Sequence, residues 1–456
     1  MKDRVEMRVQ EPDARIKNFS EVALGYSKEE ALVEAGRCLD CKHSPCVAGC
    51  PVNINIPTFI KAIREDDLKK ASDIILDANL LPGICGRVCP QETQCEAQCV
   101  RGIKGEPVAI GRLERYVGDF YHPEPEKLTP KKDKIAIVGS GPAGLACSGV
   151  LAKLGYEVHI FEALHAAGGV LIYGIPEFRL PKKVVNNEID RLRSMGIKFH
   201  LNTIIGQTKK VSELFNEGYQ AIFIGSGAGL PKFMGIPGEN LNGVYSANEF
   251  LTRVNLMKAY REEYDTPLRK MKRVVVVGGG NVAMDAARCA KRLNVEDVFL
   301  VYRRGREEMP ARLEEIAHAE EEGIRFTLLT NPVRILGDID KNIVGIECVR
   351  MELGEPDSSG RRRPVEVAGS NYVIPCDTVI MALGNHPNPL LAHATPELET
   401  NKWGCFVVDE NLKTTMAGVY AGGDAVTGAA TVILAMGAGK KAAVEIDRYL
   451  QNRHAV

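Results

Sequence analysis

The chain has no long hydrophobic run, no excess of charge of either sign and no apolar segment near its start. No stretch reaches the roughly 18 apolar residues of a membrane-spanning helix, so we expect no membrane span. The net charge of −1 creates no field that would attract nucleic acid or an anionic membrane surface. Residues 1–20 are charged throughout and lack the apolar core of a signal peptide, which predicts a cytoplasmic protein.

Tryptophan is scarce, with one residue, whereas glycine is plentiful, with 44 among 456 residues. This length predicts two to four domains at roughly 100–200 residues each. The hydrophobic share of 45% and the charged share of 26% are those of an ordinary globular protein. The glycine content fits an enzyme with many tight strand-to-helix turns, although glycine alone proves little.

The 13 cysteines are unevenly distributed. Eight lie between Cys38 and Cys99, and a reducing cytosol disfavours disulfides as their explanation. Metal ligation is the better interpretation of such a cluster. We interpret the other five as small buried apolar residues, namely Cys147, Cys289, Cys348, Cys376 and Cys405.

The clustered cysteines form two groups, Cys38-x2-Cys41-x4-Cys46-x3-Cys50-Pro51 and Cys85-x3-Cys89-Pro90-x4-Cys95-x3-Cys99. Compact runs with a proline after one cysteine are typical of [4Fe–4S] ligation, and the last cysteine of such a run can bind the other cluster. Structural zinc is the alternative, but only Cys38 and Cys41 have the C-x2-C spacing that zinc prefers. We therefore predict two [4Fe–4S] clusters, and the count of cysteines alone would give each of them four thiolates.

The first 130 residues form one mostly helical domain. Ser27–Arg37 is predicted to be a helix that begins at a capping box, with Ser27 as the N-cap and Glu30 three residues later. A second helical stretch, Ile56–Asn79, separates the two cysteine groups. Residues 121–133 contain three prolines and many charges, which is typical of an exposed linker.

From Lys134 onward, a strand, a glycine-rich turn, a helix and a second strand follow one another, and a similar unit recurs at Arg273. Two such units predict two dinucleotide-binding domains and an α/β fold. Apolar strands at 221–225 and 377–384 flank the second unit, and the chain closes with 418–426 and a helix from Thr431. We infer that the second domain, 255–375, is inserted into the first, which comprises 134–254 and 376–456.

The first unit has Gly139, Gly141 and Gly144 directly after the strand 135–138. In a strand–turn–helix context these glycines permit the tight turn, the approach of the pyrophosphate and the close packing of helix on strand. Glu162 ends the second strand, where a carboxylate accepts hydrogen bonds from ribose hydroxyls and repels a 2′-phosphate. The alternative is a surface glutamate without a ligand.

The sequence from Thr415 to Asp424 resembles the second signature of FAD-binding, disulfide-reductase-like flavoproteins. In that pattern the aspartate bonds the ribitol and the next helix directs its N-terminus at the flavin. GGDA alone could also be an ordinary turn. With the first fingerprint it predicts FAD, bound by Gly139, Ser140, Gly141, Pro142, Ala143, Gly144, Glu162, Gly169, Gly423 and Asp424.

In the second unit the turn reads Gly278-x-Gly280-x-x-Ala283, and basic residues replace the ribose-binding acid at the end of the second strand. Guanidinium groups pair bidentately with a 2′-phosphate, so NADP(H) is preferred over NAD(H). The alternative is a solvated basic strand end. The residues predicted to bind NADP(H) are Gly278, Gly280, Asn281, Val282, Ala283, Arg303 and Arg304.

Several long stretches carry a family resemblance: 85–99, 110–116, 174–182, 301–310 and 354–364. Together with the order of the motifs, they resemble the small (β) subunit of NADPH-dependent glutamate synthase and the N-terminal module of dihydropyrimidine dehydrogenase. Residues 15–46 most resemble the large subunit of ferredoxin-dependent NAD/NADP transhydrogenases. The resemblance covers nearly the whole chain.

The resemblance implies a ligand set that spacing does not predict. One cluster would be held by Cys38, Cys41, Cys46 and Cys99. The other would be held by Cys50, Cys89, Cys95 and the carboxylate of Glu114. Cys85 would then not be a ligand, in contrast to the count of eight thiolates, and we adopt the set that the family implies.

The expected activity is that of an NADPH-dependent flavoprotein oxidoreductase, with hydride transfer between the two nucleotide domains. The cofactors carry this chemistry, so we assign no catalytic residue. The chain begins Met1-Lys2 without a cysteine nucleophile and has no room for a further barrel of about 250 residues, so we expect an electron-transfer partner subunit. That partner is either a smaller ferredoxin- and NAD-linked subunit, with bifurcating FAD, or an amidotransferase-type glutamate synthase subunit.

Two further alternatives stay open at this point. The chain could form a homo-oligomer, and it could be a non-enzymatic iron–sulfur redox sensor. Intact fingerprints in both nucleotide domains argue against the sensor. The composition predicts no membrane and no nucleic acid among the partners.

Overall fold

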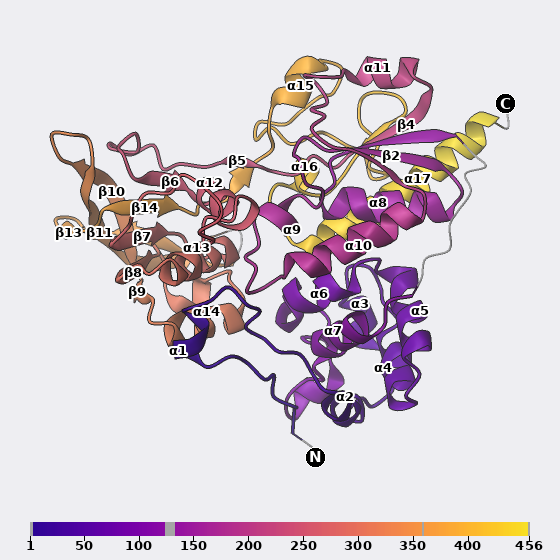
Figure 1. The fold of residues 1–456 in the computed structure, drawn as a ribbon, viewed down its shortest axis with the longest axis horizontal. Helices are drawn as coiled ribbons and strands as arrows, with labels where there is room; N and C mark the ends of the chain where they lie inside the picture. Colours follow the sequence, from indigo (N-terminus) through magenta and orange to yellow (C-terminus); the bar gives the residue numbers. More distant parts are fainter. Residues whose placement is uncertain (1–2, 124–132, 358–359, 455–456) are drawn as a thin grey trace.

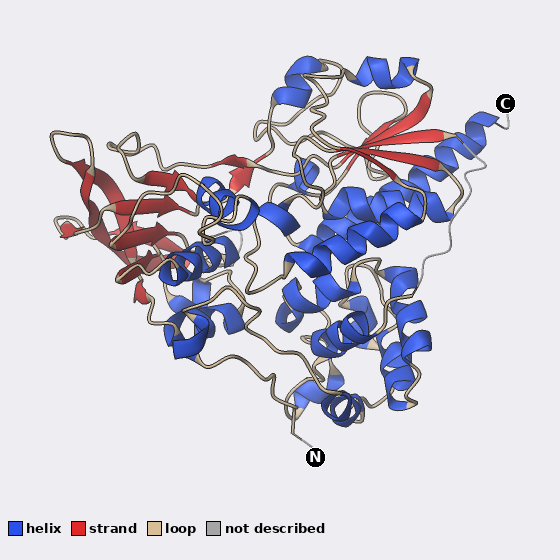
Figure 2. Ribbon diagram, in the orientation of Figure 1, coloured by secondary structure: helices blue, strands red, loops and turns tan. Residues whose placement is uncertain are grey.

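The structure is a computed structural model that describes residues 3–123, 133–357 and 360–454. Figure 1 shows three lobes: a helical one at the bottom, one at the upper right and one at the left. The strands gather in the two upper lobes (Figure 2). The predicted fold class is confirmed, with a helical domain followed by two Rossmann-like domains, one inserted into the other. We call them the helical domain, the first sheet domain and the second sheet domain.

The helical domain consists of short helices joined by tight turns, with bounds α1 Pro12–Arg15, α2 Lys28–Ala35, α3 Pro45–Ala48, α4 Ile56–Arg64, α5 Leu68–Ala78, α6 Pro82–Val88, η1 Gln91–Thr93, η2 Val100–Ile103 and α7 Ile110–Phe120. The capping box of α2 is present as predicted, since Ser27 and Glu30 each bond the other's backbone N–H. The single helix expected at 56–79 is two helices. The chain turns at Asp66, where φ is 58°, and the Asp67 side chain caps α5.

The first 24 described residues, 3–26, form a strap that leaves the helical domain, reaches the second sheet domain and returns. Its two arms meet at an antiparallel bridge between Val9 and Ala23. The dark indigo segment in Figure 1 places α1, at the far end of the strap, beside α14 (Leu313–Glu321). There Arg15 is fully buried and pairs with Glu322 at 2.9 Å and Glu321 at 2.6 Å. The strap therefore connects two domains that are far apart in sequence.

The first sheet domain contains a parallel sheet of order β16-β4-β1-β2-β3. Its elements are β1 Lys134–Val138, α8 Pro142–Lys153, β2 Glu157–Phe161, α9 Val170–Tyr173, α10 Lys182–Ser194, β3 Lys198–His200, α11 Val211–Asn216, β4 Tyr219–Ile224, α15 Leu390–Ala394, β16 Val419–Ala421, α16 Asp424–Thr427 and α17 Val432–His454. Helices α8, α10 and α17 cover one face of the sheet. Their apolar side chains form one continuous core with the helical domain, which joins the two domains firmly.

The second sheet domain contains a parallel sheet of order β6-β14-β7-β8-β9 and a smaller antiparallel sheet. Its elements are β6 Val244–Ser246, α12 Ala247–Leu251, η3 Thr252–Leu256, β7 Arg273–Val277, α13 Asn281–Arg292, β8 Asp297–Val301, η4 Arg306–Glu308, α14, β9 Arg325–Thr327, β10 Thr330–Gly337, β11 Ile343–Pro356, β12 Arg362–Glu366, β13 Tyr372–Ile374 and β14 Thr378–Met381. Every one of these strands lies between β4 and β16 in sequence.

Sheet membership corrects the boundaries predicted for the inserted domain. Strands β6 and β14 pair within the second sheet, whereas the ranges 134–254 and 376–456 assigned both to the first domain. The chain crosses between the domains at a two-stranded ribbon, β5 Leu230–Pro231 with β15 Asn385–His386. A short strand belongs to whichever neighbour it bonds, and its own sequence does not reveal that neighbour. Most of the linker expected at 121–133 lies outside the described residues.

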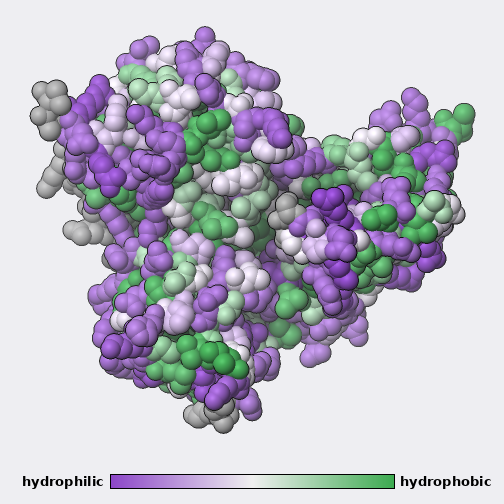
Figure 3. All heavy atoms as spheres, turned by 180° about the vertical axis from the view of Figure 1, so that it is seen from behind, coloured by the Kyte–Doolittle hydropathy of each residue, from purple (hydrophilic) through white to green (hydrophobic). Residues whose placement is uncertain are grey.

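The surface of the molecule and the burial of the five scattered cysteines are those expected of an ordinary globular protein. From behind, the outer faces of the lobes are mostly hydrophilic, and hydrophobic residues reach the surface between the lobes (Figure 3). The five scattered cysteines are buried as predicted. None of the described helices combines the length and the apolarity of a membrane span.

The packing of α17 on α8 leads to a test. A Cβ at Gly439 would lie 2.1 Å from the carbonyl oxygen of Ala143, so Gly439→Ala should force the two helices apart. We expect a loss of about 2 kcal/mol in stability, which a thermal melt would record as a fall in Tm. Gly229→Ala is the matched control, because nothing lies within 4 Å of a Cβ there. Equal Tm values for both variants would contradict the close contact.

Candidate functional site

The first glycine turn joins β1 to α8. Gly139 has a φ of 99°, and a Cβ there would lie 2.5 Å from the Gly225 carbonyl oxygen. A Cβ at Gly144 would lie 2.0 Å from the Gly139 carbonyl oxygen, whereas nothing lies within 4 Å of one at Gly141. The first and third glycines are therefore required by packing, and the second faces open space. That is the arrangement with which a pyrophosphate approaches a helix N-terminus.

Glu162, at the end of β2, is buried beside this turn. Its carboxylate accepts hydrogen bonds from the backbone N–H groups of Ser140 and Leu164, both at 2.9 Å, and from the Ser140 hydroxyl. The same hydroxyl accepts from the Gly168 N–H at 2.9 Å. A Cβ at Gly169 would lie 3.0 Å from the Gly141 Cα. Four of the residues predicted to bind FAD thus lie together around the first glycine turn, namely Ser140, Gly141, Glu162 and Gly169.

The closing signature reaches the same place from the far end of the chain. A Cβ at Gly423 would lie 3.0 Å from the Cβ of Ala143, so the segment that begins with Asp424 abuts α8. Burial raises the pKa of Asp424 to about 6. Burial also raises the pKa of Tyr173 to about 12, and the carboxylates of Glu162 and Asp424 add to that rise. Tyr173 is thus a site residue that no sequence motif indicated.

The second glycine turn joins β7 to α13. Gly278 has a φ of 146°, and a Cβ there would lie 2.4 Å from the Ala382 carbonyl oxygen. Gly280 is the N-cap of α13, and the nearest atom to a Cβ there is 3.8 Å away. Ala283 is fully buried against the sheet, whereas Val282 is partly exposed. The Asn281 side chain accepts from the Arg312 N–H at 3.0 Å and so ties this turn to the start of α14.

The two arginines predicted to bind a 2′-phosphate have different environments. Arg303 is exposed, whereas Arg304 is buried. The Arg304 guanidinium pairs with Asp357 at 2.6 Å and donates to the Arg362 carbonyl at 2.8 Å. Both arginines lie in the bend that follows β8, and the long-range partners of Arg304 account for its burial. The Arg304 guanidinium is therefore bound to residues of the antiparallel sheet region. Of the two, Arg303 is the arginine whose side chain a nucleotide phosphate can reach from solvent.

Four of the eight clustered cysteines line one cavity of the helical domain: Cys38, Cys41, Cys46 and Cys99. Its walls include the apolar side chains of Ile56 and Ile60, both on α4. The Val108 N–H lies 3.5 Å from the Cys99 sulfur. Burial raises the pKa of Cys46 to about 11, and Cys99 and Cys38 add to that rise. We call these four the outer group.

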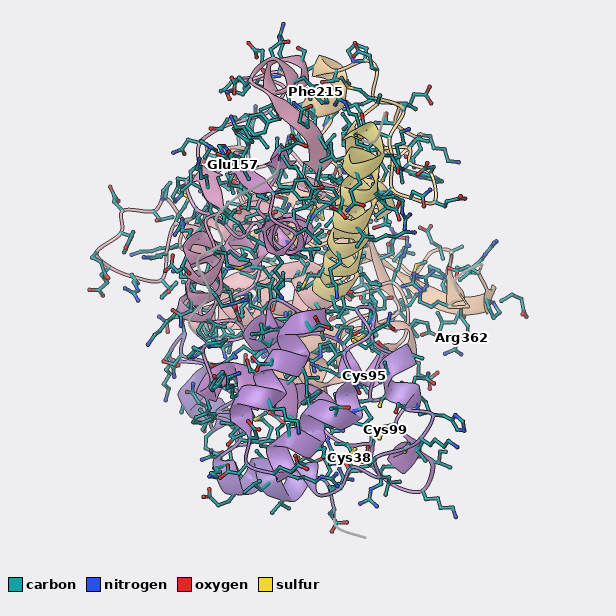
Figure 4. All side chains as sticks on the ribbon, turned by 90° about the vertical axis from the view of Figure 1, so that its right-hand side faces the viewer. Cys38, Cys95, Cys99, Glu157, Phe215 and Arg362 are labelled. Carbon is teal, nitrogen blue, oxygen red and sulfur yellow. The ribbon has the colours of Figure 1, made fainter. Side chains whose placement is uncertain are left out.

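A second set of thiols lies deeper, and Figure 4 shows Cys95 nearer to α17 than Cys38 and Cys99. Burial raises the pKa of Cys50 and Cys95, and the carboxylate of Glu114 adds to the rise at both. Cys89 is also close to Glu114, and its pKa is raised by a hydrogen bond with Cys85 and by burial. We call Cys50, Cys89, Cys95 and Glu114 the inner group.

Glu114 and Cys85 share a neighbour in Asn79. The Asn79 amide donates to Glu114 at 2.6 Å, and burial raises the pKa of that carboxyl to about 8. The Cys85 sulfur lies 3.7 Å from the Asn79 amide oxygen and 3.5 Å from the sulfur of Met436, which belongs to α17. Cys85 therefore lies within the same buried cluster as Cys89 and Glu114, with Met436 as a further neighbour.

A single metal ion and an iron–sulfur cluster make different demands on their ligands. Within the described ranges, no three Cys, His, Asp or Glu side chains are close enough to hold one metal ion. In a cubane each thiolate binds a different iron atom, whereas the four ligands of a zinc site must all meet at one centre.

Comparisons with known proteins agree with this geometry. Residues 15–125 match the family model of dihydropyrimidine dehydrogenase domain II, 4Fe-4S cluster, and residues 133–439 match that of pyridine nucleotide-disulphide oxidoreductases. Fold, glycine turns and cysteines together define an NADPH-dependent flavoprotein oxidoreductase with an iron–sulfur domain. More narrowly, the chain belongs to the family of the glutamate synthase small subunit, because it is 36% identical to the glutamate synthase [NADPH] small chain of Escherichia coli over 95% of this chain and 94% of that one.

Other relatives differ in their reported roles. The NADP(+)-dependent formate dehydrogenase subunit beta of Moorella thermoacetica is 40% identical over 90% of this chain, which spans 60% of that relative's length. The NADPH-Fe(3+) oxidoreductase subunit beta of Geobacter sulfurreducens is 39% identical over 96% of this chain and 69% of its own.

Solved structures are more distant and support the fold alone. Mycobacterium tuberculosis FprA in complex with NADPH has a TM-score of 0.60 and 21% identity, over 71% of this chain and 86% of that one. The thioredoxin reductase of T. acidophilum has a TM-score of 0.52 and 20% identity, over 71% of this chain and 100% of its own.

The contrast between Arg303 and Arg304 gives a test. Arg303→Ala should raise the Kd of NADPH about tenfold with little change for NADH, because only NADPH carries the 2′-phosphate. Arg304→Ala should instead lower Tm, because Asp357 and the Arg362 carbonyl lose their shared donor. Titration of each nucleotide and thermal melts check both. Equal losses of NADPH and NADH affinity in Arg303→Ala would overturn the assignment.

Proposed function

We propose that this chain passes electrons from NADPH through FAD to the inner and then the outer of two [4Fe–4S] clusters, and from there to a partner subunit. The observation that carries the proposal is the position of the inner group between the outer group and the first sheet domain. Pro51, which follows Cys50, lies against α17: its carbonyl oxygen would be 3.2 Å from a Cβ on Gly437. The helix α17 itself follows the Asp424 segment. The four outer cysteines are partly exposed, which suits a cluster that passes electrons to a partner subunit.

The residues around the first turn fit FAD. The open space at Gly141 and the N-terminus of α8 would receive the pyrophosphate, Glu162 a ribose, and Asp424 the ribitol. The residues around the second turn fit NADP(H) in the same way, with Arg303 toward the 2′-phosphate. When bound, the flavin converts the electron pair of a nicotinamide into single electrons, and the protein positions the cofactors.

The two groups also fit the ligand sets. The outer cluster would be held by the four outer cysteines, and the inner cluster by Cys50, Cys89, Cys95 and Glu114. We assign Cys85 no ligand role because the family resemblance implies none. A carboxylate ligand is harder than a thiolate and should shift the potential of the inner cluster relative to the outer one.

This assignment predicts opposite results for two substitutions. Glu114→Ala should lose the inner cluster, so that iron falls from about eight to about four atoms per chain. Cys85→Ala should keep about eight, because its thiol is not a ligand. Iron and sulfide analysis of anaerobically purified protein measures both. The reverse pattern would show that Cys85 is the eighth ligand.

For the partner, we propose the smaller ferredoxin- and NAD-linked subunit of an electron-bifurcating transhydrogenase, on the resemblance of residues 15–46. The glutamate synthase large subunit is the second candidate, favoured by the coverage of 94% of the E. coli small chain. All 13 cysteines are free of disulfides, which suits a reducing cytoplasm. Anaerobic purification from the native host distinguishes the candidates. A co-purifying chain smaller than this one supports the first, and one several times larger supports the second.

The electron route itself has a direct test. NADPH added anaerobically to the purified protein should bleach the flavin absorbance and then reduce the clusters, as followed by visible and electron paramagnetic resonance spectra. NADH at the same concentration should act far more weakly. A protein with full flavin and iron content that NADPH does not bleach would refute the function and favour a redox sensor.

A further inference from the structure

The contact between the two sheet domains is built from buried ion pairs. Arg179 lies in the segment 174–181 of the first sheet domain, Asp285 on α13 and Glu315 on α14. The Arg179 Nη1 donates to both oxygens of Asp285, at 2.8 and 2.7 Å, and its Nε lies 3.1 Å from Glu315. The exposed fractions of the three side chains are 7%, 4% and 7%. Asp285 and Glu315 thus both pair with Arg179 where little of them is exposed, and Glu315 also pairs with Arg288.

Apolar packing also closes this contact, because Phe178, beside Arg179, is buried in the apolar core of the second sheet domain. A cavity of about 200 Å³ borders the contact, lined among others by Phe178, Arg179, Arg288 and Glu315. Two guanidinium groups of α13 lie over the Phe178 ring, Arg288 at 4.7 Å and Arg292 at 3.9 Å from its centroid. Apolar surfaces tolerate sliding, whereas paired charges with fixed hydrogen-bond directions do not. The ion pairs therefore add a directional constraint to a junction that Phe178 also packs.

Both ends of the Arg179–Asp285 pair are connected to a proposed cofactor turn. Asp285 lies one helical turn beyond the N-terminus of α13, which would receive the phosphates of NADPH. The segment 174–181 continues directly from α9, whose N-cap Gly169 lies against Gly141. Asn255 of the second sheet domain reinforces the junction by donating to the carbonyls of Tyr173 and Gly174, at 3.2 and 3.3 Å.

We propose that Arg179, Asp285 and Glu315 are positioning residues for hydride transfer. They hold α13 in the orientation that brings a nicotinamide on the second sheet domain to a flavin on the first. The proposal rests on the proposed function, and it assigns none of the three a contact with the reacting atoms. Buried ion pairs serve specificity of arrangement better than net stability, and a misplacement of about 1 Å can cost about 100-fold in rate.

The variants Arg179→Met and Asp285→Asn test this. In anaerobic stopped-flow experiments, flavin reduction at saturating NADPH should slow about tenfold or more. The Kd of NADP⁺ should change less than about threefold, since the nucleotide turn itself is intact. Arg179→Lys should reduce the flavin faster than Arg179→Met does, because lysine keeps the positive charge but lacks the bidentate guanidinium. Arg334→Met is the control: it removes an exposed arginine that pairs with Glu347 within the antiparallel sheet.

A second readout does not depend on turnover. Hydrogen exchange of the purified flavoprotein without nucleotide should be faster in 174–181 and α13 of Arg179→Met, and unchanged in the helical domain. The double variant should be no slower than the worse single variant, because both remove the same contact. If Arg179→Met loses its flavin, the rate of flavin reduction and the hydrogen exchange of Asp285→Asn and Arg179→Lys test the positioning role instead.

The outcomes separate the two proposals. If NADPH does not reduce the wild-type flavin, the proposed function fails. If the wild type is reduced and the variants match it in rate and in exchange, only the positioning role fails. A raised Kd with an unchanged limiting rate would make the three residues part of nucleotide binding, which also overturns the positioning role.

Discussion

The backbone contact between α8 and α17 organises most of this molecule. The helices approach so closely that Gly439 has no room for a side chain beside Ala143. Helix α8 begins at the first glycine turn, and α17 follows the segment of Asp424, so the contact joins the two halves of the proposed FAD site. The same stretch of α17 also meets the helical domain, with Met436 beside Cys85 and Gly437 beside Pro51. One helix pair thereby connects the flavin part with the inner cysteine group.

The two domain junctions differ in their chemistry. The helical domain and the first sheet domain share one apolar core, which fixes the inner group relative to the flavin part. The second sheet domain is held by buried charges as well as by apolar contacts. Arg179 and the strap residue Arg15 form ion pairs with it, while Phe178 and the strap residue Val22 pack in its apolar core. Glu322 accepts hydrogen bonds from Arg15, Arg288 and Arg292 in that network, and such buried pairs favour one arrangement over others.

The glycine turns, the capping box and the buried lone cysteines were predictable because each depends on a few neighbouring residues. The two arginines after β8 were not separable by sequence, since their burial depends on Asp357 from a distant strand. The boundaries of the inserted domain were misplaced for a similar reason, as β6 and β14 find their partners across the second sheet. Tyr173 and Asn255 carry no motif, and only long-range contacts place the first near Glu162 and Asp424 and the second at the domain junction.

The sequence by itself determined the family, the fold class, the two nucleotide turns and the presence of a cysteine-rich domain, because these are written in short spacings. Only the tertiary structure placed one set of cysteines around a cavity and Cys85 beside Asn79 and Met436. It alone brought Arg179 to Asp285 and the strap to α14. Those contacts join residues from different parts of the chain, so they depend on how whole domains pack and not on any local pattern.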